Sequence, residues 1–285
     1  MPSIVIIGGG PAGLSAAIYA ARANVPTTVL YQDGGALAKT DRIENYFGFP
    51  QPLSGAELLA QGQAQAARLG AALVQTEVTG IEYVAQGFSV RTTAGTYEAD
   101  AVILATGAPR SAPKLPGIAE LEGRGVSYCA VCDAFFYRGK AVAVLGQGEY
   151  ALEEARVLLP VAASVTLLTN GSTAPASLPD GLQLDPRPVA AITGTDKVTQ
   201  IDFADGAPLP VDGIFIAYGT AGSGDFARKL GAQTENGKIV TDADGATAVP
   251  GLFAAGDCTG GLLQVAKAVA DGAQAALRAV KFIRT

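Results

Sequence analysis

A glycine-rich turn near the start of the chain limits the fold more than any other feature. Gly8, Gly10 and Gly13 follow a short apolar run over residues 3–7 and open an alanine-rich, helix-like stretch over residues 14–23. This spacing at a strand-to-helix turn is typical of dinucleotide binding. Gly8 allows the tight turn, Gly10 lets the backbone approach a pyrophosphate, and Gly13 lets the helix pack close to the strand. The sequence therefore predicts a phosphate site at this helix N-terminus, and a plain glycine-rich turn is the alternative.

Two buried strands further along the chain end in matching motifs. The first, over residues 101–107, ends in Ala-Thr-Gly, and the second, over residues 251–257, ends in Ala-Gly-Asp. Together they form a two-part signature of FAD-binding folds, in which Asp257 accepts a sugar-alcohol hydroxyl of the cofactor. The helix expected over about residues 263–282 directs its N-terminal dipole at the flavin. An N-cap role is the structural alternative for Asp257.

A second unit of the same kind lies between these segments. Residues 141–155 read as strand, turn and helix, and another strand follows. The predicted fold class is therefore α/β, with two Rossmann-like dinucleotide-binding domains and the second inserted into the first. We expect the FAD-binding domain to cover residues 1–116 and 246–285, and the inserted domain to cover residues 117–245.

Charge and composition exclude several classes of function. The chain has 20 basic and 26 acidic residues with no basic run, so we expect no nucleic-acid partner. It lacks an apolar stretch of ~18 residues and a secretory signal, so we expect a cytoplasmic protein that does not span a membrane. The chain has no histidine, which excludes Ser-His-Asp and Cys-His catalysis. Three cysteines cannot form a four-thiolate zinc site, and no metal site is expected.

Two of the cysteines, Cys129 and Cys132, form a Cys-x-x-Cys motif, which in a cytosolic protein predicts redox chemistry. The segment from Cys129 to Lys140 resembles the redox segment of low-molecular-weight thioredoxin reductases. Residues 43–50 and the pair Gly34-Gly35 are similar to that family as well. The order of FAD segment, inserted domain and FAD segment also agrees, so the resemblance spans almost the whole chain.

The resemblance implies a role for each matching residue. Cys132 lies against the flavin, Cys129 attacks the disulfide of the protein substrate, and Asp133 is the acid/base; a thiolate is the nucleophile in such exchange. Thioredoxin is the implied partner, FAD the implied cofactor, and a homodimer the implied assembly. The residues implied to bind FAD are Gly8, Gly10, Pro11, Ala12, Gly13, Asp33, Gly35, Leu37, Asn45, Ala105, Thr106, Gly107, Gly256, Asp257, Gln264, Val265 and Ala266. For Asp33 a turn role is the alternative, and for Arg138 and Lys140 solvated charge is the alternative to favouring the thiolate.

The inserted domain departs from the NADPH-dependent members of that family. Glu149 stands near the first helical turn, where a pyrophosphate should bind, although it also complements the helix dipole. Thr169-Asn170-Gly171 replaces the family's His-Arg-Arg cluster for the 2′-phosphate, and residues 157–186 contain no cation. The domain is also shorter, and Gln264-Val265-Ala266 replaces Arg-Gln-Ala near the flavin. We therefore expect pyridine-nucleotide binding to be lost.

The electron donor is inferred from a further resemblance. Residues 254–267, with Cys258 among them, look like the corresponding segment of ferredoxin-linked flavin thioredoxin reductases, although Cys258 also suits a buried core position. The favoured path runs from ferredoxin to FAD, then to Cys129 and Cys132, then to thioredoxin. A flavin dithiol oxidase using oxygen, an NAD(P)H-dependent thioredoxin reductase and a flavin-bearing sensor are the alternatives.

The charge of one segment bears on the donor. Five basic residues outnumber three acidic ones between residues 110 and 140, and a local basic face would steer an acidic ferredoxin. Scattered solvated charge is the alternative. The basic residues are Arg110, Lys114, Arg124, Arg138 and Lys140, and the acidic ones are Glu120, Glu122 and Asp133.

Overall fold

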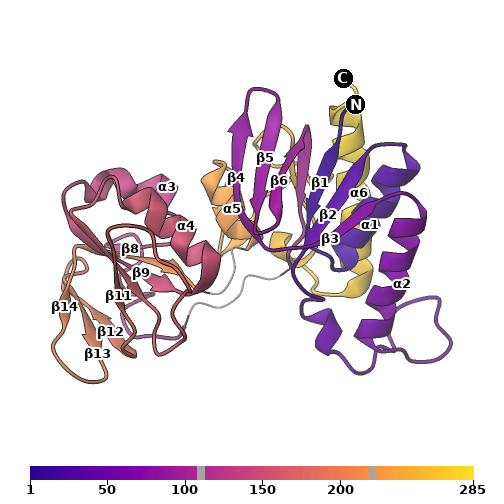
Figure 1. Ribbon diagram of the computed structural model, residues 1–285. Coiled ribbons are helices and arrows are strands. Elements are labelled where there is room, and N and C mark those ends of the chain that lie inside the picture. The colour runs from indigo at the N-terminus through magenta and orange to yellow at the C-terminus, as the bar shows by residue number, and fades with distance from the viewer. Residues whose placement is uncertain (108–112, 219–221) are drawn as a thin grey trace. The chain divides into compact units, whose positions relative to one another are not determined.

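The computed structural model describes residues 1–107, 113–218 and 222–285. The chain divides into two compact units (Figure 1). The first unit comprises Met1–Pro109 and Gly222–Thr285, and the inserted unit comprises Arg110–Ala221. Each unit holds its own five-stranded parallel sheet, which confirms the expected α/β fold with one Rossmann-like domain inserted into another.

The boundaries differ from the expected ones at residues 117 and 245, and the inserted unit ends well before residue 245. Helix α5 (Ser223–Lys229) packs against β4 and β17 of the first unit. The backbone N–H of Ser223 donates to Thr106 Oγ1 at 2.8 Å, and the two hydroxyls lie 2.8 Å apart. These bonds tie the start of α5 to the end of β7, so residues 222–245 belong to the first unit.

The parallel sheet of the first unit is buried on both faces. All four residues of β1 and of β7 are buried, as expected for parallel strands covered on both sides. The strand order is β18 (Leu252–Ala254), β7 (Ala101–Leu104), β1 (Ile4–Ile7), β2 (Thr27–Tyr31) and β3 (Ala72–Gln75).

Helices α1 and α6 lie side by side against this sheet (Figure 1). Small residues allow the close crossing, because a Cβ on Gly272 would lie 2.0 Å from the carbonyl oxygen of Ala12. The helical segments of the unit, besides α5, are α1 (Pro11–Arg22), η1 (Leu37–Lys39), α2 (Gly55–Arg68), η3 (Gly256–Thr259) and α6 (Val265–Phe282). Its antiparallel strands are β4 (Val78–Val84), β5 (Gly87–Thr92), β6 (Gly95–Ala99), β16 (Thr234–Glu235) and β17 (Lys238–Ile239).

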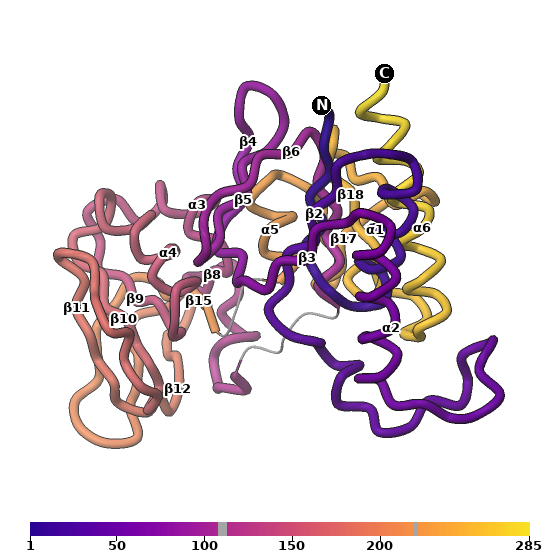
Figure 2. Tube along the Cα trace, turned by 45° about the vertical axis from the view of Figure 1, so that its right-hand side comes forward, coloured from indigo at the N-terminus to yellow at the C-terminus, as the bar shows by residue number. Residues whose placement is uncertain are grey.

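The inserted unit repeats this plan, and Figure 2 traces its strands side by side. Its parallel strands, in sheet order, are β11 (Leu182–Asp185), β10 (Ser164–Leu168), β9 (Ala141–Gly146), β15 (Gly213–Ala217) and β8 (Val126–Ser127). A three-stranded antiparallel sheet holds β12 (Val189–Thr193), β13 (Gln200–Phe203) and β14 (Leu209–Pro210). The helical segments are α3 (Ala130–Asp133), η2 (Ala134–Tyr137) and α4 (Gly148–Leu158). In the described ranges of both units, no helix is both long and apolar enough to cross a membrane.

Candidate active site

The glycine-rich turn between β1 and α1 has the geometry that its spacing predicts. Gly8 has φ +123°, and a Cβ there would lie 2.2 Å from the carbonyl oxygen of Ala105, the residue after β7. A Cβ on Gly13 would lie 1.9 Å from the carbonyl oxygen of Gly8. A Cβ on Gly10, in contrast, would meet no described atom within 4 Å. The turn is therefore closed where it packs against the protein and open at Gly10.

The N-terminus of α1 suits a phosphate. Gly10 is the N-cap residue and brings no side chain to bond the first N–H groups, and Pro11 begins the helix. The first turn, Pro11 to Leu14, carries no charge. Free N–H groups and the positive end of the helix dipole together form an anion site.

Other residues expected to bind FAD contact α1 or one another. A Cβ on Gly256 would lie 2.9 Å from the Cβ of Ala12, so the Ala-Gly-Asp turn lies against α1. The side-chain amide of Asn45 donates to Gln264 Oε1 at 2.9 Å, which joins the loop after β2 to the residue before α6. Distant segments of the sequence therefore meet in the first unit.

The other residues expected to bind FAD lie in the same unit, at the ends of other strands and helices. Asp33 Oδ1 accepts the N–H of Gly35 at 2.8 Å, which is the turn role given above as the alternative. Its contact with a ribose remains a prediction. Leu37 lies in η1, Val265 and Ala266 begin α6, and Thr106 and Gly107 follow β7.

Asp257 lies in η3, and two residues that the sequence analysis missed hold this turn. The ammonium of Lys238 donates to the carbonyl oxygen of Asp257 at 2.8 Å, and Asp271 Oδ2 accepts the N–H of Gly256 at 3.1 Å. The N-caps of η3 and α6 are Ala255 and Gln264, so the alternative N-cap role of Asp257 is wrong. The open turn, the uncapped helix and the Gly256-Asp257 turn held by these two bonds fit FAD.

The redox pair lies in the inserted unit, at the end of β8. Cys129 and Cys132 form a disulfide, with Cα atoms 5.3 Å apart. Cys129 is the N-cap of α3, and its sulfur accepts the N–H of Cys132 at 3.2 Å. Cys129 is only 4% exposed, whereas Cys132 is exposed. The division of roles that the resemblance implies, with Cys132 against the flavin and Cys129 attacking the substrate disulfide, stays a prediction.

Asp133 is fixed beside this pair by Ser127, a third residue that the sequence analysis missed. The Ser127 hydroxyl donates to Asp133 Oδ2 at 2.7 Å and accepts the N–H of Cys129 at 3.1 Å. One buried hydroxyl thus connects the expected acid/base to the redox loop. Arg138 lies over the ring of Phe135 at 5.3 Å and is exposed, in keeping with the solvated-charge alternative.

The turn before α4 differs from the turn before α1. Glu149 stands in the first turn of α4, as predicted, and lies 3.8 Å from Arg156. The next residue, Tyr150, is only 2% exposed and fills the interior at this helix start. A carboxylate at the helix end repels a phosphate, so this turn is a poor pyrophosphate site.

The segment 157–186, which includes β10, contains no Lys or Arg, so it offers no cation to a 2′-phosphate at the end of this strand. Asn170 uses its side-chain oxygen to accept the N–H of Val189 at 2.8 Å. The next cation along the chain, Arg187, donates to both carboxylate oxygens of Asp185, with Nη2 at 2.6 Å from Oδ2. These hydrogen bonds lower the pKa of Asp185, and the Arg187 guanidinium lies 3.8 Å from the centroid of the Phe203 ring. Arg187 is thus held by its contacts with Asp185 and Phe203.

Cys258 is a core residue, as the structural alternative proposed. It is buried, and its thiol donates to the carbonyl oxygen of Ala255 at 3.2 Å. Burial raises the pKa of Cys258 to about 11, so the thiol stays protonated at neutral pH. A reactive thiolate is therefore expected from the redox pair, not from this residue.

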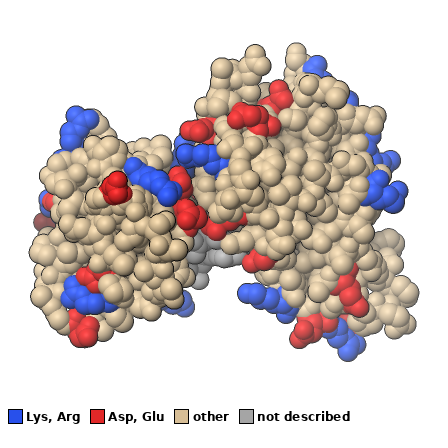
Figure 3. Space-filling model, viewed as in Figure 1, with Lys and Arg blue, Asp and Glu red and all other residues tan. Residues whose placement is uncertain are grey.

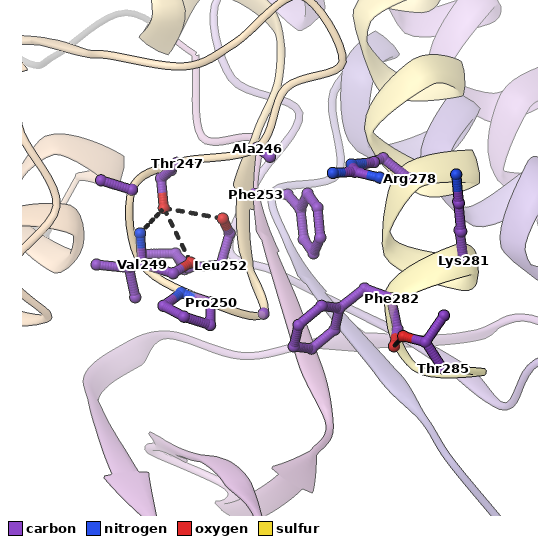
Figure 4. A pocket seen from close by; sticks show the side chains of 12 residues that line it. Ala246, Thr247, Val249, Pro250, Leu252, Phe253, Arg278, Lys281, Phe282 and Thr285 are labelled. Atoms are coloured by element: carbon purple, nitrogen blue, oxygen red, sulfur yellow. Dashed lines mark hydrogen bonds between the residues drawn. The ribbon is translucent and has the colours of Figure 1, made fainter.

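A cleft of about 290 Å³ lies elsewhere in the first unit, between the loop before β18 and the end of α6 (Figure 4). Thr247 Oγ1 accepts the N–H of Val249 at 3.1 Å and donates to the carbonyl oxygen of Leu252 at 2.9 Å. The cleft adjoins the amino end of β18, whereas the glycine-rich turn follows the carboxyl end of the parallel strand β1. It is therefore separate from the expected cofactor site.

Comparisons with known proteins agree with this architecture. A family model described as pyridine nucleotide-disulphide oxidoreductase matches residues 2–272. The chain is 40% identical to a thioredoxin reductase of Aquifex aeolicus, over 98% of this chain and 93% of that protein. Its fold is similar to the atypical thioredoxin reductase of Desulfovibrio vulgaris Hildenborough, with TM-score 0.93, 43% identity, and coverage of 100% and 98%. It is also similar to a ferredoxin-flavin thioredoxin reductase of Clostridium acetobutylicum, with TM-score 0.70, 33% identity, and coverage of 98% and 96%.

Proposed function

This chain belongs to the low-molecular-weight thioredoxin reductase family of the pyridine nucleotide-disulphide oxidoreductases, and from that premise we propose that it reduces thioredoxin with electrons from ferredoxin. Members of this family are flavin disulfide oxidoreductases that bind FAD. The bound flavin supplies the redox group between the electron donor and the disulfide of Cys129 and Cys132.

One observation carries the choice of donor: the phosphate end of the inserted unit is occupied by the protein's own groups. Glu149 places negative charge in the first turn of α4. Asn170 and Arg187, at the end of β10 and just beyond β11, are bonded to Val189 and Asp185. A charged hydrogen bond contributes about 1.5–3 kcal/mol, so the loss of two weakens nucleotide binding by several orders of magnitude. Similarity to a ferredoxin-flavin thioredoxin reductase supports the same choice.

The roles that the family resemblance implies give the order of the exchange with thioredoxin. In the reduced pair, the Cys129 thiolate attacks one sulfur of the thioredoxin disulfide; that S–S bond breaks and a mixed disulfide forms. The Cys132 sulfur, which lies against the flavin in this proposal, then attacks Cys129, which restores the intramolecular disulfide and releases reduced thioredoxin. Asp133, held by Ser127, donates a proton to a departing thiolate and takes one from an attacking thiol.

The proposal extends to the partners of the protein. We expect a homodimer, as the resemblance to the family implies, and a cytoplasmic location, as argued from the sequence. The basic face that would steer ferredoxin stays a prediction, since Arg110 lies outside the described residues. On the face shown in Figure 3, Lys and Arg side chains are scattered or stand beside acidic ones. Arg124, for example, donates to the carbonyl oxygen of Glu120.

An anaerobic experiment tests the donor. NADPH, NADH and chemically reduced ferredoxin are each added to the FAD-loaded protein, and the visible flavin absorbance is followed. Rapid bleaching by ferredoxin alone is expected, and ferredoxin-driven turnover should fall as salt rises. Bleaching by micromolar NADPH would show an NADPH-dependent enzyme. Failure of ferredoxin together with fast oxygen uptake on small dithiols would favour the oxidase.

A further inference from the structure

A buried carboxylate that the exchange does not use lies directly beneath the redox loop. Glu154 is only 1% exposed, although the residue before it, Glu153, pairs with Arg156 at the helix surface. Glu154 Oε2 accepts the backbone N–H of Ala130 at 2.7 Å. Ala130 is the first residue of α3 and follows Cys129 directly. Four covalent bonds therefore separate the bonded nitrogen from the Cys129 sulfur.

The placement of Glu154 follows from the face that α4 buries. Tyr150, Glu154 and Leu158 recur every four residues and are all buried, so they share one face of the helix. This face packs against α3, which Figure 1 shows beside α4. A carboxylate is rarely buried unless its hydrogen bonds compensate for the lost water. The bond to Ala130 supplies such a partner in this chain.

We propose that Glu154 is a positioning residue for the redox pair, acting through the N–H of Ala130. This inference rests on the proposed redox role of Cys129 and Cys132. Ala130 is fully buried, so its N–H has no route to water while the disulfide closes the loop. A buried donor without an acceptor is costly. Once the disulfide is reduced, the loop is free to move and the Ala130 N–H can reach water. The loss of the Glu154 acceptor therefore costs less free energy in the dithiol state than in the disulfide state.

The loss of this acceptor should therefore disfavour the disulfide relative to the dithiol. Glu154→Leu is expected to raise the equilibrium constant for reduction of the pair at least tenfold, which is about 30 mV. Glu154→Gln keeps an oxygen that accepts the Ala130 N–H, so it should stay within about threefold of the parent. Glu153→Leu, one position earlier on the same helix, should leave the equilibrium unchanged.

The experiment equilibrates each FAD-loaded variant in a series of dithiothreitol buffers, traps free thiols and counts them by mass. It needs neither ferredoxin nor thioredoxin, so a failure of the proposed donor or substrate does not affect it; a pair that never reduces would refute the proposed function instead. An unchanged equilibrium in Glu154→Leu would overturn the inference, as would a shift in Glu154→Gln equal to that of Glu154→Leu. If Glu154→Leu does not fold, amide exchange decides: the Ala130 N–H should be protected in the oxidised parent, and rapid exchange there overturns the inference.

Discussion

The two units of the molecule share one strand plan but use the helix that follows a central strand, α1 or α4, in opposite ways. Each has five parallel strands with a glycine-containing turn leading from a central strand into a helix. In the first unit the helix end is uncharged and open at Gly10. In the inserted unit the helix end carries Glu149, and its inner face carries Tyr150 and Glu154. A Rossmann-like sheet therefore supplies a place for a nucleotide, and the residues of the turn decide whether one binds.

The difference also separates the two parts of the chemistry. The first unit presents the features that fit a cofactor: an open turn, an uncapped helix and the turn around Asp257 fixed by Lys238. The inserted unit presents the sulfur pair on a short helix supported from below by α4. In the proposed function α4 faces no phosphate, and it is free to serve as the support of the redox loop.

The largest effect is expected from substitution of the redox cysteines. It should abolish the disulfide chemistry of the inserted unit and leave FAD binding by the first unit intact. Cys129→Ser and Cys132→Ser should each abolish thioredoxin reduction, because exchange needs an attacking and a resolving sulfur. FAD should stay bound in both variants. Activity assays and the flavin absorbance per chain check this.

The two cysteine variants should differ in one further respect. Cys132→Ser should accumulate a mixed disulfide with thioredoxin through Cys129, visible on a non-reducing gel, because the resolving sulfur is missing. Cys129→Ser should not, because it lacks the attacking sulfur. The opposite pattern would show that the exposed Cys132 attacks the substrate instead.

The next effect concerns the open turn of the first unit. Gly10→Glu gives this turn the charge that Glu149 gives the other one. We expect FAD affinity to fall roughly 100-fold or more, because bulk and negative charge enter the space at the helix N-terminus. Titration of the apoprotein with FAD, followed by flavin fluorescence, measures the change.

Gly10→Ala is the matched control for size without charge. Its φ of −82° suits any residue, and its Cβ would meet no described atom within 4 Å, so the apoprotein should remain as stable as the parent. An intermediate loss of FAD affinity is expected. Unchanged FAD binding in Gly10→Glu would contradict the assignment of this turn to the cofactor.

A smaller effect concerns Arg187, the next cation along the chain after the end of β10. Asp185→Asn should lower the free energy of unfolding by about 1 kcal/mol at pH 7, a modest value because the Arg187 pair is partly exposed. The pKa of Asp185 is lowered in the folded protein, so the stabilisation exists above its unfolded pKa and is lost as pH falls through the lower folded value. Parent and variant should therefore converge in urea unfolding as pH drops below about 4.

Asp180→Asn is the control for this comparison, because Asp180 is exposed and lies in the same unit. It should leave the unfolding curve unchanged at both pH values. A constant difference between Asp185→Asn and the parent across this range would contradict the ion-pair explanation. Tight NADPH binding by Asp185→Asn would show that the ion pair with Asp185 alone prevents Arg187 from binding a 2′-phosphate.

Much of this architecture could be predicted from local sequence. The glycine spacing, the Ala-Gly-Asp strand end and the apolar runs gave the fold class, because each is set by residues near in sequence. The assignment of residues 222–245 to the first unit could not be predicted from local sequence. It depends on hydrogen bonds between Ser223 and Thr106, which are 117 positions apart. No local motif marks that contact.

The redox loop shows the same limit. The Cys-x-x-Cys spacing predicted the pair, but the exposure of each sulfur depends on how α3 packs against α4. Glu154 stands beside another glutamate and looks like surface charge in the sequence. The four-residue spacing from Tyr150 to Leu158 was the signal that could have placed it inside.

The smallest expected effect tests whether Glu149 is a structural residue or a remnant of a nucleotide turn. Glu149→Gln should lower the free energy of unfolding by about 0.5 kcal/mol, because an acid in the first turn stabilises the helix dipole. The ion pair with Arg156 adds little, since both side chains are nearly half exposed. Glu153→Gln is the control, because Glu153 is a closer partner of Arg156 but lies beyond the first turn of α4. It should lower the free energy of unfolding by less than Glu149→Gln does. Urea unfolding of both variants at low salt makes the comparison.

Calorimetric titration of Glu149→Gln with NADPH tests the nucleotide reading of the same residue. It should detect no binding, because the segment 157–186 still supplies no cation at the end of β10. Clear NADPH binding by this variant would mean that one charge alone separates the two turns.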